Sequence, residues 1–254
     1  MGINIGEGFQ VLYADCPWEY FNDQDHDPAR GGTPYPQMDL ADLCQMSYLV
    51  NQVVSKDSIL FMWATFPKLI EALQTMSSWG YKYVTTAFDW IKLNPNGELF
   101  SPLSNMSTFN TPGKNDGFRL TPKDVILKGG IRSGQGYYTN ANAEICLLGT
   151  KGKTGELRAN RSVKQVVFCD DVANRIGWEG ETIMTPIKEH SAKPEEVRER
   201  INVLTGGVPA LELFARPPAR VPGWVKLGWE IDNRDIREML QELIDGNYRR
   251  PKDG

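Results

Sequence analysis

The stretch Val11-Leu12-Tyr13-Ala14-Asp15-Cys16-Pro17-Trp18 joins a short apolar run to an acid, a proline and an aromatic residue. An apolar run of this length is typical of a buried strand in a parallel sheet. In an open α/β sheet, ligands bind beyond the carboxyl ends of the strands. The stretch therefore predicts a first buried strand and a functional site at its end.

The residues that follow this strand suit a planar base with an exocyclic amine. The Asp15 carboxylate can accept one N–H of an amino group, and the Cys16 carbonyl can accept the other. Pro17 restrains the backbone because its φ is locked at about −65°, and Trp18 offers an aromatic face for stacking. With both protons engaged, the nitrogen lone pair can turn towards an electrophile. The alternative is an edge strand that ends in a turn beside a core tryptophan, and four residues alone favour it.

The rest of the chain alternates strand and helix patterns, which indicates a parallel sheet covered by helices. Residues 19–37 are rich in Asp, Gly and Pro and are predicted to form a substrate loop or lid. Residues 94–140 have little periodicity and are predicted to be a substrate-facing insertion, since compact domains rarely carry such long loops. Further strands are predicted at 59–65, 84–91, 144–149, 166–168, 210–216 and 224–231, and helices at 39–49, 67–79, 194–204 and 235–245.

The composition excludes several classes of protein. With 41% hydrophobic and 24% charged residues, the chain is expected to be globular. No apolar run is long enough to cross a membrane and no signal peptide is visible, so a cytoplasmic protein is expected. Four widely spaced cysteines and two histidines argue against a zinc site or a disulfide framework. The net charge of −4 means that any nucleic acid must be held by a local patch.

Four blocks of sequence follow one another in a specific order. They are Asp15-Cys16-Pro17-Trp18, Glu189-His190-Ser191-Ala192-Lys193-Pro194, Leu211-Glu212-Leu213-Phe214-Ala215-Arg216, and Gly223-Trp224 with Gly228-Trp229-Glu230. In this order they resemble the MT-A70 family of S-adenosylmethionine-dependent adenine-N6 methyltransferases, which act on DNA or RNA. The resemblance implies an α/β, Rossmann-like class I methyltransferase fold. Its mostly parallel seven-stranded sheet would be permuted so that the catalytic half precedes the cofactor half.

The resemblance also implies roles for individual residues. Asp15, Cys16, Pro17 and Trp18 would form the catalytic motif, with no metal. The cofactor, S-adenosyl-L-methionine, would be bound by Asp15, Lys193, Glu212, Phe214, Arg216 and Glu230, and the substrate by Trp18, Tyr35, Glu144, Ser191 and Lys193. Taken singly, Lys193 and Glu230 can equally be solvent-exposed charges without a function, and Arg216 can instead pair with Glu212.

Three departures from the family pattern concern the site. Cys16 replaces the proline of most members, but the contribution there is a backbone carbonyl, which any residue provides. Trp229 stands where relatives often have an asparagine beside the ribose. Pro218-Ala219 lack the polar pair of some eukaryotic members. The last two concern details of the cofactor pocket.

Residues 1–233 are predicted to be the methyltransferase domain, and residues 234–254 a C-terminal helix and basic tail. The expected reaction is in-line methyl transfer to the N6 amine of an adenine that is flipped out or single-stranded. The compact form resembles prokaryotic and phage members, which favours DNA over RNA and the cytoplasm of a prokaryote or phage-infected host. An RNA methyltransferase, or a catalytically silent nucleic-acid-binding or scaffold subunit of a heterodimer, is the alternative. Asp15, Trp18, Lys193 and Glu230 together argue against the silent subunit; a homodimer or heterodimer is left open.

Overall fold

In the computed structural model, the chain divides into two compact units. Unit 1 comprises Met1–Ala87, Ile145–Val163 and Val197–Gly254, and unit 2 comprises Phe88–Glu144 and Lys164–Glu196. The described residues are 6–20, 35–93, 138–139, 143–163, 165, 183–186, 193–218 and 221–249. No helix in these ranges combines the length and the hydropathy that a membrane span requires.

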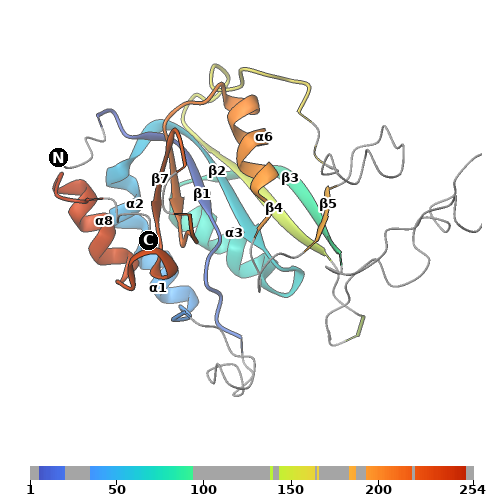
Figure 1. Cartoon of the computed structure of the whole chain (residues 1–254), viewed down its shortest axis with the longest axis horizontal. Helices are drawn as coiled ribbons and strands as arrows, with labels where there is room; N and C mark the ends of the chain where they lie inside the picture. Colours follow the sequence, from blue (N-terminus) through green and yellow to red (C-terminus); the bar gives the residue numbers. More distant parts are fainter. Residues whose placement is uncertain are drawn as a thin grey trace, which may run out of the picture. The chain divides into compact units, whose positions relative to one another are not determined.

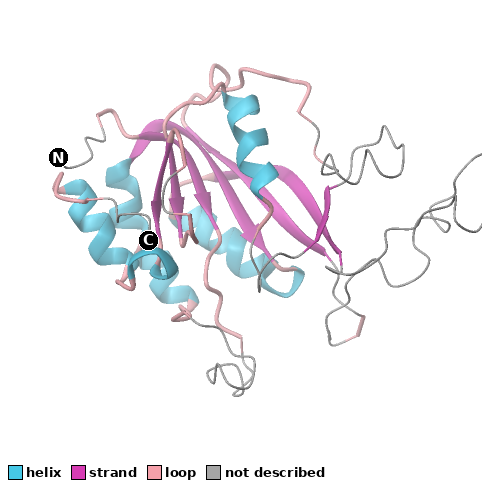
Figure 2. Ribbon diagram, viewed as in Figure 1, coloured by secondary structure: helices cyan, strands magenta, loops and turns pink. Residues whose placement is uncertain are grey.

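The strands form a seven-stranded sheet in the order β5-β3-β4-β2-β1-β6-β7 (Figures 1 and 2). β1 pairs in parallel with β2 and β6, β6 with β7, and β3 with β5, whereas β2 and β4 are antiparallel. The predicted mostly parallel α/β sheet is confirmed. The strands are β1 (Phe9–Ala14), β2 (Val54–Ala64), β3 (Lys82–Leu93), β4 (Ala143–Lys151), β5 (Ile183–Pro186), β6 (Ala210–Leu213) and β7 (Trp224–Leu227).

The strand order brings the two ends of the chain together within unit 1. β1 lies between β2 and β6, so that Ala14 is in register with Met62 on one side and Leu213 on the other. In Figure 1, the blue β1 lies beside strands from the red end of the chain, with β2 on its other side. Because β1, β6 and β7 run parallel, the residues that follow them, from Asp15 and Phe214 onwards, leave at one edge of the sheet. A crevice at such a change in strand order is the usual ligand site of an α/β sheet.

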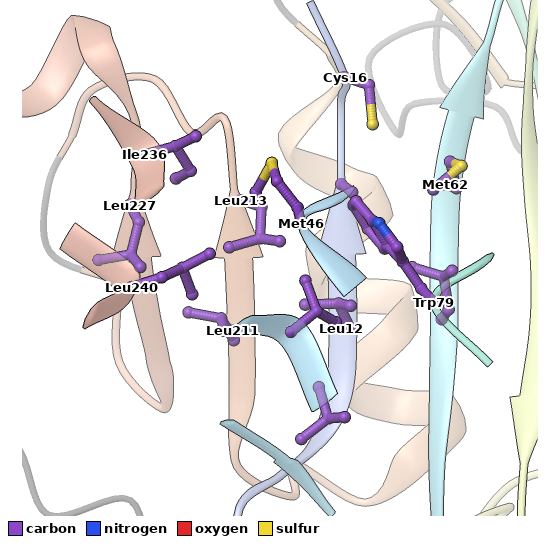
Figure 3. Close-up of a cluster of buried hydrophobic side chains, with 14 of the residues drawn as sticks. Leu12, Cys16, Met46, Met62, Trp79, Leu211, Leu213, Leu227, Ile236 and Leu240 are labelled. Carbon is purple, nitrogen blue, oxygen red and sulfur yellow. The ribbon is translucent and has the colours of Figure 1, made fainter. Parts of the chain in front are cut away.

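One face of these strands packs against α1 (Leu40–Gln45), α2 (Ser47–Val53), α3 (Leu69–Ser78) and α8 (Ile236–Ile244). Successive strand residues point to opposite faces, so alternate apolar residues join the helices in one buried cluster. Burying each large apolar side chain contributes roughly 1.5–3 kcal/mol to stability. Figure 3 shows part of this cluster, including Leu12, Met46, Trp79, Leu211, Leu213, Leu227, Ile236 and Leu240.

The opposite face is covered by α6 (Glu195–Thr205). Arg198 of this helix bonds the carboxylate of Glu212, and Asn202 accepts a hydrogen bond from the Trp224 indole at 3.0 Å. Helices therefore cover both faces of the unit 1 strands, as the alternating pattern predicts.

The helix starts agree with their capping chemistry. The Asp39 carboxylate accepts the Asp42 N–H at 2.7 Å, and Asp235 accepts the Arg237 N–H at 2.7 Å. Side-chain oxygens at these positions satisfy N–H groups that have no partner inside the helix. The predicted helix 39–49 is interrupted at Met46, where α1 ends and α2 continues to Val53.

Two strand predictions were too long at the edge of the sheet that carries Asp15. β6 ends at Leu213 because Phe214 turns the chain with a φ of 58°. β7 ends at Leu227, and the short helix α7 (Trp229–Asp232) follows, so Glu230 is helical and not in a strand. The pattern did not predict β5. The predicted strand 166–168, most of loop 19–37 and nearly all of the insertion 94–140 lie outside the described residues.

Candidate active site

A pocket lies where β1, β6 and β7 end. It spans about 730 Å³, a volume that includes space open to solvent. Its walls come from four separate parts of unit 1. The lining residues are Asp15, Pro17, Tyr35, Pro36, Gln37, Met38, Asp42, Phe214, Ala215, Arg216, Trp229, Glu230, Arg234, Asp235, Ile236 and Arg237.

The motif after β1 is held by its own backbone. The Cys16 carbonyl accepts the Trp18 N–H at 2.9 Å, and the Pro17 carbonyl accepts the Met38 N–H at 2.9 Å. A carbonyl oxygen can accept two hydrogen bonds, so the bond from Trp18 leaves the predicted role of Cys16 chemically open. Asp15 is partly exposed and lines the pocket.

Trp18 lies in the hydrophobic cluster and not in the pocket wall. Only 7% of its surface is exposed, and within the described part of the chain its indole nitrogen has no hydrogen-bond partner. Its stacking on a base therefore stays a prediction.

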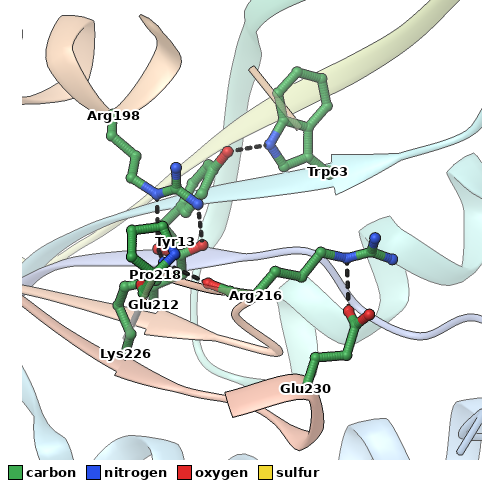
Figure 4. Close-up of polar contacts among 8 residues, drawn as sticks. All are labelled: Tyr13, Trp63, Arg198, Glu212, Arg216, Pro218, Lys226 and Glu230. Atoms are coloured by element: carbon green, nitrogen blue, oxygen red, sulfur yellow. Dashed lines mark hydrogen bonds and ion pairs between the residues drawn. The ribbon is translucent and has the colours of Figure 1, made fainter. Parts of the chain in front are cut away.

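Arg216 and Glu230 form an ion pair in the pocket, with the Arg216 Nε 2.8 Å from the Glu230 Oε2 (Figure 4). The Arg216 guanidinium also lies 5.3 Å from the centroid of the Tyr35 ring, a distance at which cations and aromatic faces attract. The structure thus brings together Asp15, Tyr35, Phe214, Arg216 and Glu230, all of which were predicted from the sequence.

The close approach of two backbone segments shapes this side of the pocket. The Ala215 N–H donates to the Leu227 carbonyl at 2.8 Å. A Cβ on Gly228 would lie only 2.1 Å from the Ala215 oxygen, so that position requires glycine. Phe214 adopts a left-handed conformation that is rare for a bulky residue. Strained residues of this kind concentrate at functional sites.

Glu212, which the resemblance assigns to the cofactor, lies on the other face of the sheet. Its two oxygens accept bonds from Arg198 at 2.8 and 2.7 Å under α6. The alternation of strand side chains is the reason, since Leu211 and Leu213 face the opposite cluster. The alternative pairing of Arg216 with Glu212 is wrong: Arg216 pairs with Glu230.

Unit 2 contains a second group of predicted residues. The Lys193 Nζ lies 3.2 Å from the Glu144 Oε2, and Lys92 pairs with the other oxygen of Glu144. Burial alone would raise the pKa of Glu144, but the charges of Lys193 and Lys92 outweigh it and lower that pKa. Two lysines around one carboxylate leave the cluster with net positive charge. Ser191 lies outside the described residues.

Trp229, which the sequence places beside the ribose as a departure from the family pattern, is 37% exposed and lines the pocket next to Glu230. Sequence reasoning missed the start of α8, which contributes Arg234, Asp235 and Arg237 to the pocket. The α8 residues gave no signal, because the sequence pattern indicates an amphipathic helix and not what its first turn faces.

Comparison with known proteins supports the same family. The family model described as MT-A70 matches residues 9–115 and 122–230. The type II methyltransferase M.MunI of Mycoplasma sp is 26% identical, over 94% of this chain and 84% of that protein. The human N(6)-adenosine-methyltransferase catalytic subunit METTL3 is 24% identical, over 99% of this chain and 34% of that protein.

A Drosophila melanogaster N(6)-adenosine-methyltransferase MT-A70-like protein is 26% identical, over 97% of this chain and 30% of its own length. The chain thus spans most of the Mycoplasma protein and about a third of the two animal proteins. The family model covers most of the chain, and the motifs at the ends of β1, β6 and β7 are those that suggested the resemblance. The chain belongs to the MT-A70 family of N6-adenine methyltransferases.

Proposed function

We propose that this chain transfers the methyl group of S-adenosylmethionine to the N6 amine of adenine in DNA. The observation that carries the proposal is the pocket in which Asp15 lies with the Arg216–Glu230 ion pair. An acid suited to an amine and an acid suited to a ribose are thereby present in one cavity of unit 1.

The pocket residues fit an adenosine-containing cofactor. The Glu230 carboxylate can accept hydrogen bonds from both hydroxyls of a ribose. Phe214 and Trp229 supply aromatic faces for a purine. The 2.8 Å contact with Arg216 fixes the position of the Glu230 carboxylate in the pocket. The bound cofactor supplies an electrophilic methyl group attached to a sulfonium sulfur. This sulfur leaves readily because it departs as a neutral thioether.

Asp15 would orient the acceptor nitrogen. Its carboxylate accepts one amine proton and the Cys16 carbonyl accepts the other, which turns the lone pair towards the methyl carbon. Because the acceptor nitrogen would gain positive charge on methylation, the Asp15 carboxylate would stabilise that charge and would accept the proton that the nitrogen then loses. Positioning of this kind supplies roughly 7–11 kcal/mol in favourable cases.

The preference for DNA is supported by the comparison with the type II methyltransferase M.MunI, of which the chain covers 84%, whereas it covers 34% of human METTL3. Because the amine of a paired adenine is buried in the duplex, the base must be flipped out or single-stranded.

The test is methylation by the purified chain. The protein is incubated with labelled S-adenosylmethionine and duplex DNA, single-stranded DNA or RNA, and N6-methyladenine is quantified by nucleoside mass spectrometry. We expect product in DNA, and a loss of at least about 100-fold for Asp15→Ala with an unchanged thermal midpoint. Asp245→Ala, at an exposed acid beyond α8, is the matched control.

Each other result has a definite meaning. N6-methyladenine in RNA alone would mean that the substrate is RNA and not DNA. Full activity of Asp15→Ala would remove Asp15 from the mechanism. If calorimetry detects no binding of S-adenosylmethionine, the chain is a silent subunit and the proposal fails.

A further inference from the structure

Lys226 is a fully buried lysine just outside the pocket. Its Nζ donates to the carbonyl of Arg216 at 2.6 Å and to the carbonyl of Pro218 at 2.7 Å, and it lies 3.9 Å from the Glu212 Oε2. Figure 4 shows the Lys226 ammonium next to Pro218 and bonded to the Arg216 carbonyl. No part of the pocket lining is contributed by Lys226 itself.

A buried ammonium is costly unless its protons are satisfied and its charge is paired. An ammonium has three donors, and here it meets two carbonyls and a carboxylate. Both carbonyls belong to residues 216–218, which leave the end of β6. Lys226 therefore links β7 to the segment from which the Arg216 side chain enters the pocket.

The carboxylate behind Lys226 is itself held in place. Arg198 grips Glu212 through two hydrogen bonds, and its guanidinium lies 5.8 Å from the centroid of the Tyr13 ring. The Tyr13 hydroxyl accepts the Trp63 indole N–H at 2.6 Å, and burial raises the pKa of Tyr13, so the hydroxyl stays neutral. The ammonium thus pairs with a carboxylate that Arg198 holds in place, and it bonds to the carbonyls of Arg216 and Pro218.

The end of β7 contacts that segment at three consecutive residues. Lys226 bonds the carbonyls of residues 216 and 218, the Leu227 carbonyl accepts the Ala215 N–H at 2.8 Å, and Gly228 leaves room for the Ala215 oxygen. Glu230 follows two residues after Gly228. The same short stretch therefore sets the position of both Arg216 and Glu230.

We propose that Lys226 is a positioning residue for the cofactor pocket. Its ammonium holds the backbone at 216–218, so that Arg216 keeps its 2.8 Å pairing with Glu230. The inference rests on the proposed function, because binding of the cofactor is its readout. Lys226 thus affects the affinity for the cofactor only through the position of Arg216.

The first test is Lys226→Met, which keeps most of the length of the side chain and removes its donors and charge. We expect the Kd of S-adenosylhomocysteine, measured by calorimetry, to rise about tenfold, as for loss of a charged hydrogen bond. The turnover number at saturating cofactor and DNA should change less than about threefold, because the proposed role of Lys226 is in cofactor binding and not in the transfer step. Lys56→Met, at an exposed lysine of β2, is the matched control and should bind as the wild type does.

The second test is a double-mutant cycle with Arg216→Met. If Lys226 acts through Arg216, Lys226→Met should weaken binding less than about twofold in the Arg216→Met background. A merely structural role would weaken binding by the same factor in both backgrounds, and that result would overturn the inference. If Lys226→Met does not fold, as judged by circular dichroism, the same cycle is run with Lys226→Gln, which keeps amide donors.

The two proposals fail in different ways. A wild-type chain that does not bind S-adenosylhomocysteine removes the proposed function and, with it, the role of Lys226. A wild-type chain that binds it, with the same Kd for Lys226→Met, leaves the function standing and overturns the role of Lys226 alone.

Discussion

Carboxylates in this chain serve different purposes according to the partner that each one meets. Glu212 is buried and gripped by the planar fork of Arg198, which suits a permanent support. Glu144 is equally buried but is paired with two lysines. Glu230 is more exposed, lies in the pocket and pairs with Arg216, and a carboxylate has enough acceptor sites to bond a ligand as well.

At this scale, Glu144 predicts an effect of acid on stability. Because its pKa in the folded chain is lowered by Lys193 and Lys92, its ionised form stabilises the fold above the ordinary glutamate range near 4.5. That contribution is lost as the pH falls through the lower folded pKa. We expect Glu144→Gln to be less stable than the wild type at pH 7, and the difference in unfolding free energy to shrink below about pH 4.5.

Urea unfolding at a series of pH values measures this difference, and Glu156→Gln, at an exposed glutamate, is the control. A difference between Glu144→Gln and the wild type that stays constant from pH 7 to pH 3 would contradict the prediction.

At the scale of elements, the site depends on where two strands stop. β6 and β7 are each four residues long, and the segments that follow them approach closely enough to exclude a Cβ at position 228. Phe214 and Gly228 therefore end β6 and β7 just before the residues that line the pocket. If β6 or β7 continued, Arg216 or Glu230 would lie within the sheet and not in the pocket.

Gly228→Ala tests this arrangement. The added Cβ would meet the Ala215 backbone at 2.1 Å, and overpacking of this kind costs about 1–3 kcal/mol. For a chain of this size we expect the thermal midpoint to fall by roughly 2–12 °C and cofactor affinity to fall with it. Gly155→Ala, where a Cβ meets nothing within 4 Å, should change neither quantity. Equal thermal midpoints for Gly228→Ala and Gly155→Ala in differential scanning calorimetry would contradict the close approach of Gly228 to the Ala215 backbone.

At the scale of the whole molecule, a ligand of the pocket should stabilise the fold. A cofactor that binds only the folded chain adds about 2.7 kcal/mol at a concentration of 100 times its Kd. We expect S-adenosylhomocysteine at that concentration to raise the thermal midpoint by roughly 5–11 °C. At the same ligand concentration the shift should be smaller for Glu230→Gln, which loses the carboxylate in the pocket, than for Glu238→Gln, an exposed glutamate of α8.

Equal shifts for these two variants would remove Glu230 from the binding site. Absence of any shift in the wild type, together with no calorimetric binding, would argue against a cofactor site in this pocket.

The amino-acid sequence by itself determined the features that depend on neighbours along the chain. Apolar runs predict β1 and the cores of β2, β3 and β4, because burial of a strand requires consecutive apolar residues. Asp39 and Asp235 indicate helix starts, since capping is a local interaction. The order of the motifs indicated the family, and with it the permuted sheet and six of the residues that line the pocket.

Only the tertiary structure decided which charges meet. Arg216 pairs with Glu230 and Arg198 with Glu212 because the strand order and the alternation of faces bring them together, and neither is visible in local periodicity. The burial of Trp18 and the antiparallel direction of β4 are likewise set by contacts between distant segments. Local sequence determines what each element can be, whereas the site arises from strand ends that are far apart in the chain and adjacent in the sheet.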